Sequence, residues 1–284
     1  KNENLIYHKV KYIEVVVNGN SLGLYNFTEA HTEQMLLNNK KVNGPIVFYD
    51  KNEWVKETSN LISLSPDQYK DSYFRSKLNL VNKSSLVDND KLTNLTYHAF
   101  YLLTSFREKK LSVREVFDVD QLAKVFAIKA IFGAVEFDWK DIKFYLNPNT
   151  LKLEPIGREV HVDIANQGHE PKTWWMNLKD ENFTHSVDQK YFLELFFEDK
   201  DFMKTYLGEL KRIADLEYLK KVIKINETSI RREAKLLKRY HPNIKVFSEE
   251  KMKRQIEFIQ KSIKSIEKNN IYFSKKNKKM LFNG

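Results

Sequence analysis

The chain has 284 residues, of which 42% are hydrophobic and 13% aromatic, enough for one large domain or two lobes around a cleft. It contains no cysteine, which excludes a disulfide framework, a zinc–thiolate centre and a cysteine nucleophile. The net charge is +10, and no run approaches the roughly 20 apolar residues of a membrane-spanning helix, so we expect no membrane span in this sequence.

The first part of the chain predicts a small β-rich lobe. Residues 12–17 are a β-branched run, the Asn-Gly pair at 18–19 is a hairpin signal, and residues 22–27 alternate as the partner strand. A short helix over 29–38 and a strand over 46–49 follow it. A hairpin, a helix and a further strand together indicate an α+β unit.

Residues 56–91 are rich in Ser, Asn, Asp and Lys and have weak periodicity, which predicts a long polar insertion. Four apolar residues indicate that part of it packs onto the core: Tyr73, Phe74, Leu78 and Leu80. We therefore assign residues 1–92 to a β-rich N-terminal lobe that includes the insertion. Residues 93–284 form a mainly helical lobe that carries a hairpin within 138–163.

Apolar residues at helical spacing predict a helix over 94–108 and a second one that is capped by Asp118 or Asp120 and ends at Gly133. Further helices are expected after residue 191. Their apolar stripes are Phe202, Tyr206, Leu210 and Ile213; Leu216, Leu219, Val222, Ile223, Ile230 and Leu237; and Met252, Ile256, Ile259, Ile263 and Ile266. Such stripes are typical of packing between helices rather than of ligand sites. We also expect Arg107 to pair with an acid on a neighbouring helix.

The segment 261–284 carries seven lysines and a single glutamate, Glu267. One interpretation is a solvated helix end. The functional alternatives are an acidic protein partner, nucleic acid or an anionic surface. Because no motif that reads bases accompanies the charge, nucleic acid is the least favoured of these partners.

A tight hairpin is predicted by the strand 143–146, the Asn-Pro-Asn-Thr turn at 147–150 and the return strand 151–156. Such a hairpin would bring the acids before it close to the acidic and histidine side chains after it. These residues are Glu136, Asp138 and Asp141 on one side and Glu159, His161 and Asp163 on the other. Crowded carboxylates repel one another without a cation, and oxygen ligands suit Mg²⁺, Mn²⁺ or Ca²⁺. The alternative is a pair of solvated acidic loops.

Five segments in this order make the sequence resemble the spore-coat protein H (CotH) kinase family. They are VNGNSLGLYNFTEAHTEQML, GPIVFYD, REKKLSVREVFDVDQLAKVFAIKAIFGA, DWKDIKFYLNPNTLKLEPIG and FFEDKDFMKTYLGELKRI. The resemblance implies a two-lobed protein-kinase-like fold of the α+β class, with a small β-rich N-terminal lobe and a mainly helical C-terminal lobe. It implies transfer of the ATP γ-phosphoryl, with Mg²⁺ or Mn²⁺, to a Ser or Thr hydroxyl of a protein substrate. It also implies a bacterial cell-envelope, secreted or spore-coat setting.

The resemblance also implies roles for particular residues. Asp138 or Asp141 would be catalytic, with Asp138 orienting the attacking hydroxyl. Asp141 and Glu159 would hold the metal, with Asp163 in support. Glu29 would be the acidic partner of a phosphate-binding lysine.

Three positions depart from the family pattern: Asp141 stands where an Asn is expected, Glu159 where the metal-binding residue is an Asp, and Phe48 where a Lys or Arg is expected. Lys51, Lys140 or Lys11 would then supply the phosphate-binding charge. Two hypotheses therefore stay open. The chain is an active, divergent kinase, or it is a catalytically degenerate pseudokinase that serves as an interaction or structural module with a basic docking surface.

Overall fold

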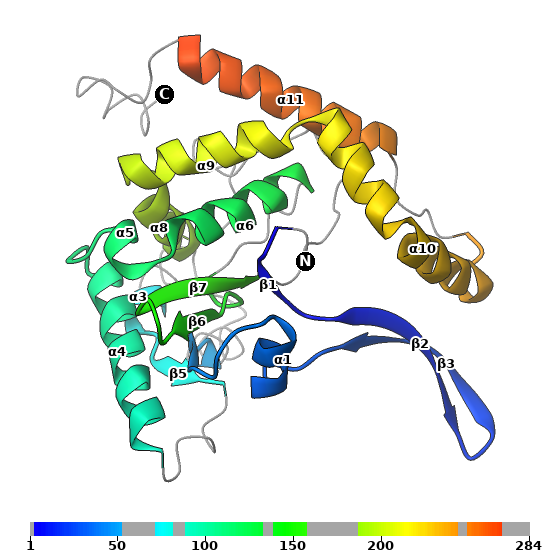
Figure 1. Cartoon of the computed structure of the whole chain (residues 1–284), viewed down its shortest axis with the longest axis horizontal. Helices are drawn as coiled ribbons and strands as arrows, with labels where there is room; N and C mark the ends of the chain where they lie inside the picture. Colours follow the sequence, from blue (N-terminus) through cyan, green and yellow to red (C-terminus); the bar gives the residue numbers. More distant parts are fainter. Residues whose placement is uncertain are drawn as a thin grey trace, which may run out of the picture.

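The computed structural model describes residues 3–52, 72–81, 89–132, 139–157, 187–243 and 249–268. The strands are β1 (Ile6–Tyr7), β2 (Val10–Val17), β3 (Asn20–Thr28), β4 (Ile46–Tyr49), β5 (Leu78–Leu80), β6 (Phe144–Asn147) and β7 (Lys152–Gly157). The helices are α1 (Glu33–Asn38), α3 (Ser72–Arg75), α4 (Asp90–Arg107), α5 (Val113–Val116), α6 (Val119–Ile131), α8 (Val187–Phe197), α9 (Lys200–Ile213), α10 (Leu216–Tyr240) and α11 (Glu249–Lys268). The described chain is therefore α+β, as predicted, with a mainly helical second half (Figure 1).

The main sheet has five strands in the order β1-β7-β6-β4-β5, with β1 parallel to β7 and every other pair antiparallel. The predicted hairpin is confirmed as β6–β7, each strand starting and ending one residue later than expected. In its turn, the Asn149 backbone N–H donates to Asn147 Oδ1 at 3.0 Å, a local bond typical of Asn in turns. Since β4 pairs with β6, the sheet joins residues from both sides of the predicted boundary at 92.

The predicted hairpin near the start of the chain is also confirmed, as a separate two-stranded sheet, β2–β3. Its turn holds Asn18 and Gly19 at φ +50° and +80°, the left-handed region that this pair of residues tolerates. The β2–β3 ribbon extends away from the body of the molecule towards the end of α10 (Figure 1). It does not join β4, which pairs with β5 and β6 instead.

Helix α6 is the centre of the core and packs between β7 and α9 (Figure 1). Its N-cap is Asp118, whose carboxylate accepts from the Gln121 backbone N–H at 3.0 Å, as predicted. The predicted end at Gly133 lies outside the described residues. Buried aromatic rings in mutual contact fill the space around α6: Phe106, Phe117, Phe126, Phe196, Phe202 and Tyr206.

The apolar stripes predicted for α9 and α11 are buried throughout, which confirms them as helix packing. The stripe predicted for α10 is not, because only Leu219 of that helix is buried. Helix α10 leaves the body after its first turns and runs out to the ribbon (Figure 1). Ile230 of the stripe therefore stays 41% exposed, and Ile225, which was not part of the stripe, is 57% exposed. Among the described helices, none is long and apolar enough to span a membrane.

Part of the polar insertion packs onto the core, as predicted: Tyr73 and Leu80 are buried, and β5 pairs with β4. Phe74, expected to pack with them, is 43% exposed. The expected acidic partner of Arg107 is not found among the described residues. The Arg107 guanidinium donates to Tyr73 O, Ser76 O and Ser76 Oγ at 2.8–3.2 Å, because those acceptors lie at the end of α3, next to α4.

We predict that Arg107→Ala lowers the free energy of unfolding by about 3 kcal/mol, since it removes charged hydrogen bonds and leaves partly buried carbonyls unpaired. The guanidinium also lies 5.4 Å from the Tyr49 ring centroid, a contact that the variant loses. Urea unfolding measures the effect. Arg114→Ala, at an exposed position on α5, is the control. A loss below about 1 kcal/mol would contradict this role for Arg107.

An ion-pair network connects Glu3 to the junction of α9 and α10. The Tyr218 hydroxyl donates to Glu3 Oε1 at 2.6 Å, and Arg212 donates to both Glu3 and Glu209. Burial by itself would raise the pKa of the Glu3 carboxyl. The hydrogen bonds from Tyr218 and Arg212 outweigh that effect and hold the pKa of Glu3 below its ordinary value of 4.5.

Because the pKa of Glu3 is lowered by folding, its contribution is present above pH 4.5 and is lost as the pH falls below that value. We predict that Glu3→Gln lowers Tm by about 2–4 °C at pH 7, the size expected for 1 kcal/mol in a chain of this length. The difference in Tm from the parent should shrink below about pH 4.5. Melting curves from pH 3 to 7 test this, with the exposed Glu257→Gln as control; a difference independent of pH would contradict it.

Candidate functional site

Two of the predicted site residues meet at one end of the main sheet. Lys51 follows β4, and Asp141 lies shortly before β6. In the antiparallel pairing of these strands Val47 lies opposite Phe144, so residues after β4 lie next to residues before β6. Lys51 Nζ and Asp141 Oδ1 are 2.9 Å apart, although 90 residues separate them in the sequence.

Further lysines lie at the same end of the sheet. Lys140 precedes Asp141, and Lys77, just before β5, accepts a hydrogen bond at its carbonyl from Asp50 N–H at 2.8 Å. Lys143 Nζ lies 5.1 Å from the Phe48 ring centroid. We name Lys51, Lys77, Lys140 and Lys143 the lysine-rich strand end, because their backbone positions lie at neighbouring ends of β4, β5 and β6.

Among the described residues, the carboxylates of Asp50 and Asp141 lie at the lysine-rich strand end. Asp50 uses one oxygen to accept from the Asn52 backbone N–H and the other to accept from Asn79 Nδ2. Asp141 is paired with Lys51, and both side chains are 48% exposed. An ion pair so exposed contributes about 1 kcal/mol or less, so phosphate oxygens could replace the carboxylate at little cost. The exposed ammonium group of Lys51 therefore suits a phosphate ligand.

Sequence reasoning missed Lys143. The departure at Phe48 had suggested that a lysine was lacking in the strand 46–49, but the neighbouring strand places Lys143 over that ring. The position of Lys143 follows from the register between β4 and β6. Because Val47 lies opposite Phe144, the next residue, Phe48, lies opposite Lys143. A register between strands almost a hundred residues apart cannot be read from either strand alone.

The structure does not bring Glu29 to these lysines. One oxygen of Glu29 accepts from the Lys9 backbone N–H at 3.0 Å, and the other accepts from Asn38 Nδ2 at 2.6 Å. Among the described residues, no lysine forms an ion pair with Glu29. Lys11, another candidate for the phosphate-binding charge, lies on the ribbon, with Nζ 5.4 Å from the Phe27 ring centroid.

Three predicted site residues, Asp138, Glu159 and Asp163, lie outside the described residues, as do Glu136 and His161. Within the described ranges, no three His, Asp or Glu side chains gather closely enough to hold a metal ion. Asp141 therefore cannot form the predicted metal site with described neighbours alone. The metal set remains a prediction that depends on carboxylates from 136–138 and 159–163.

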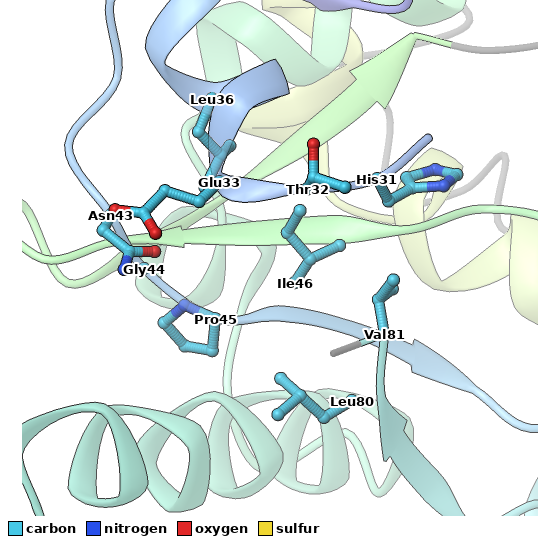
Figure 2. Close-up of a pocket in the computed structure, with 10 residues that line it drawn as sticks. All are labelled: His31, Thr32, Glu33, Leu36, Asn43, Gly44, Pro45, Ile46, Leu80 and Val81. Carbon is cyan, nitrogen blue, oxygen red and sulfur yellow. The ribbon is translucent and has the colours of Figure 1, made fainter. Parts of the chain in front are cut away.

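A small pocket lies at the other end of β4 (Figure 2). It is lined by His31, Thr32, Glu33, Leu36, Asn43, Gly44, Pro45, Ile46, Leu80 and Val81. Its cavity volume is about 40 Å³, enough for a few water molecules but not for a nucleotide. Because Ile46 begins β4 and Lys51 follows its end, this pocket and the lysine-rich strand end are separate features.

Comparison with known proteins adds no relative: no family model matches the chain, and no curated protein matches it significantly. The likeness to the CotH kinase family therefore depends on the five sequence segments alone.

Proposed function

We propose that the chain is a divergent CotH-like phosphotransferase, which moves the γ-phosphoryl of ATP to a Ser or Thr hydroxyl of a protein with Mg²⁺ or Mn²⁺. The observation that carries the proposal is the pairing of Lys51 with Asp141 inside the lysine-rich strand end. Both residues were candidates from the sequence, and they lie far apart along the chain. The exposed, cationic surroundings suit the phosphates of a nucleotide.

The proposal includes a two-lobed, protein-kinase-like arrangement. Its support is the α+β architecture of the described residues, in which strands and the two short helices α1 and α3 precede α4 and long helices make up most of the second half. The lysine-rich strand end draws on strands from both halves of the chain. A ligand held there would contact residues on both sides of residue 92.

The transfer breaks the bond from the γ-phosphorus to the bridging oxygen of ADP and forms a bond to the acceptor hydroxyl oxygen. Asp138 would orient that hydroxyl and accept its proton, while Lys51 and Lys140 would hold negative charge on the phosphates. Asp141, Glu159 and Asp163 offer the oxygen ligands that Mg²⁺ or Mn²⁺ prefers. When bound, the cation neutralises charge on the β- and γ-phosphates.

Thermal melting in the presence of ATP and a divalent cation tests the binding step. A ligand present at about one hundred times its Kd stabilises the folded state by about 2.7 kcal/mol. In a chain of this length that raises Tm by several degrees. We predict such a rise with ATP plus Mn²⁺ or Mg²⁺, a smaller one in Lys51→Met, and the full rise in the exposed control Lys204→Met. Equal melting curves with and without nucleotide would contradict nucleotide binding.

One observation favours the pseudokinase alternative, an interaction module for an acidic protein. The exposed face of α10 carries Lys221, Lys224, Arg231, Lys235 and Lys238 at helical spacing. The alternative predicts that no phosphorylated product forms with any cation. It also predicts that partner binding weakens steeply with salt, since exposed charges are screened beyond about 8 Å at physiological ionic strength.

A further inference from the structure

The two edges of the β2–β3 ribbon differ. On the β2 edge, the Tyr12 backbone N–H donates to Glu233 Oε2 of α10 at 2.8 Å, and Glu14 lies 3.7 Å from Arg239 of the same helix. Helix α10 therefore covers the β2 edge. It also reaches β3 near the turn, where Tyr240 is hydrogen-bonded to Ser21. Among the described residues, no strand pairs with the β3 edge and no backbone group of a helix bonds to it.

The register shows which groups this open edge presents. In an antiparallel pair, residues alternate between those bonded to the partner strand and those whose N–H and C=O point away. The Glu29 N–H donates to Lys9 O, so the opposed pair of Lys9 and Glu29 is bonded. From that pair onwards, every second residue of β3 is bonded to β2 and the residues between them are not. The N–H and C=O groups of Leu24, Asn26 and Thr28 therefore point away from β2. They form a row of donors and acceptors without partners in the described part of the chain.

Residues 24–28 of the β3 edge lack two features that usually prevent strands from pairing, and the register shift between Val15 and Val16 lies before them, opposite Ser21 and Gly23. Exposed edges are commonly protected by charged side chains or proline, but Asn20–Thr28 contains neither. The chain as a whole is 30% charged, so the absence is local to this strand. Large apolar side chains on it are half exposed: Leu22 at 54%, Tyr25 at 49% and Phe27 at 48%.

We propose that β3 pairs with β3 of a second copy of the chain, antiparallel and centred on Asn26, to give a continuous four-stranded sheet. In this register Leu24 lies opposite Thr28 of the partner subunit, and each Asn26 lies opposite the other. The three outward-pointing residues of each strand then exchange about six hydrogen bonds, because every such pair exchanges two. The open edge is self-complementary in this register.

Side chains and charge favour a second copy over another partner. Tyr25 lies opposite Phe27 of the partner subunit on both sides of the axis, and aromatic cross-strand pairs stabilise sheets. A strand without charge neither repels its own copy nor offers counter-charges to a charged partner. The ribbon extends from the body (Figure 1), which keeps the two bodies, each of net charge +10, apart. Because α10 covers the β2 edge, pairing stops at the dimer.

Sedimentation of the full chain at about 10 to 200 μM tests the proposal. The parent should approach twice the 33.8 kDa of one copy as concentration rises. Asn26→Lys should remain monomeric, because it sets two lysines against each other at the axis while leaving the bonds between β2 and β3 intact. Asn20→Lys adds the same charge to the same strand at its outer end and should dimerise like the parent. Circular dichroism confirms that each variant is folded.

A distance measurement identifies the register. Since the chain has no cysteine, Asn20→Cys carries one spin label per copy. Six residues on each side of Asn26, at about 3.4 Å per residue, give a separation of up to about 40 Å between the two labels, because the register shift opposite Ser21 and Gly23 shortens the strand slightly. A parent monomeric at every concentration, an Asn26→Lys variant that dimerises like the parent, or a label distance far from 40 Å would each overturn the proposal.

Discussion

Lys51→Met is expected to lose about a hundredfold or more of cation-dependent ATP turnover while melting at the parental temperature. The loss follows from removing a cation that stabilises phosphate charge as the phosphoryl group moves; one such group is worth roughly 10²–10³ in rate. The unchanged melting follows from the 48% exposure of the Lys51 and Asp141 side chains, since so exposed a pair adds about 1 kcal/mol or less to stability. ADP formation with Mn²⁺ or Mg²⁺ measures the rate.

Matched variants separate a local effect from a general change of charge. Lys204→Met removes an exposed lysine on α9 and should leave turnover unchanged. Asp138→Asn combined with Glu159→Gln should abolish turnover without unfolding the protein, because it removes the proposed proton acceptor and one metal ligand. Parental turnover in that double variant would remove both residues from the mechanism. A parent chain that forms no ADP with any cation would favour the interaction module instead.

Lys41→Met is expected to lower the free energy of unfolding by about 3–5 kcal/mol, as is typical when one partner of a buried ion pair is removed. Lys41 Nζ lies 2.6 Å from Glu154 Oε2, and the exposed fractions of the two side chains are 16% and 4%. Asn147 Nδ2 donates to the other oxygen of Glu154 at 2.7 Å. Without Lys41, a carboxylate on β7 would stay buried with its charge uncompensated.

The double variant Lys41→Met, Glu154→Gln tests this cause. Glutamine keeps a carbonyl oxygen for Asn147 but carries no charge, so most of the lost stability should return. Lys40→Met, at the exposed neighbouring position, is the control and should change stability by less than about 0.5 kcal/mol. Urea unfolding at pH 7 measures all variants. A cost for Lys41→Met alone that is no larger than the control's would show that the pair is energetically unimportant.

Helices α9 and α10 differ in how much of their apolar side is buried. Both helices were predicted from apolar residues at helical spacing, and both are present. On α9 the apolar residues are buried, whereas on α10 most of them are at least partly exposed. Periodicity identifies the side of a helix that can pack, but whether a neighbour covers that side depends on where the rest of the chain runs.

The sequence by itself determined the local structure: both hairpins with their turns, a helix cap at Asp118 or Asp120, and the helices around the core. Turn residues, caps and periodicity act within a few positions of one another, so one sequence suffices to find them. Only the tertiary structure decided that Lys51 meets Asp141, that Lys143 lies over Phe48, and that Arg107 binds the carbonyls of Tyr73 and Ser76. Those contacts depend on strand register and helix docking, which the packing of distant segments determines.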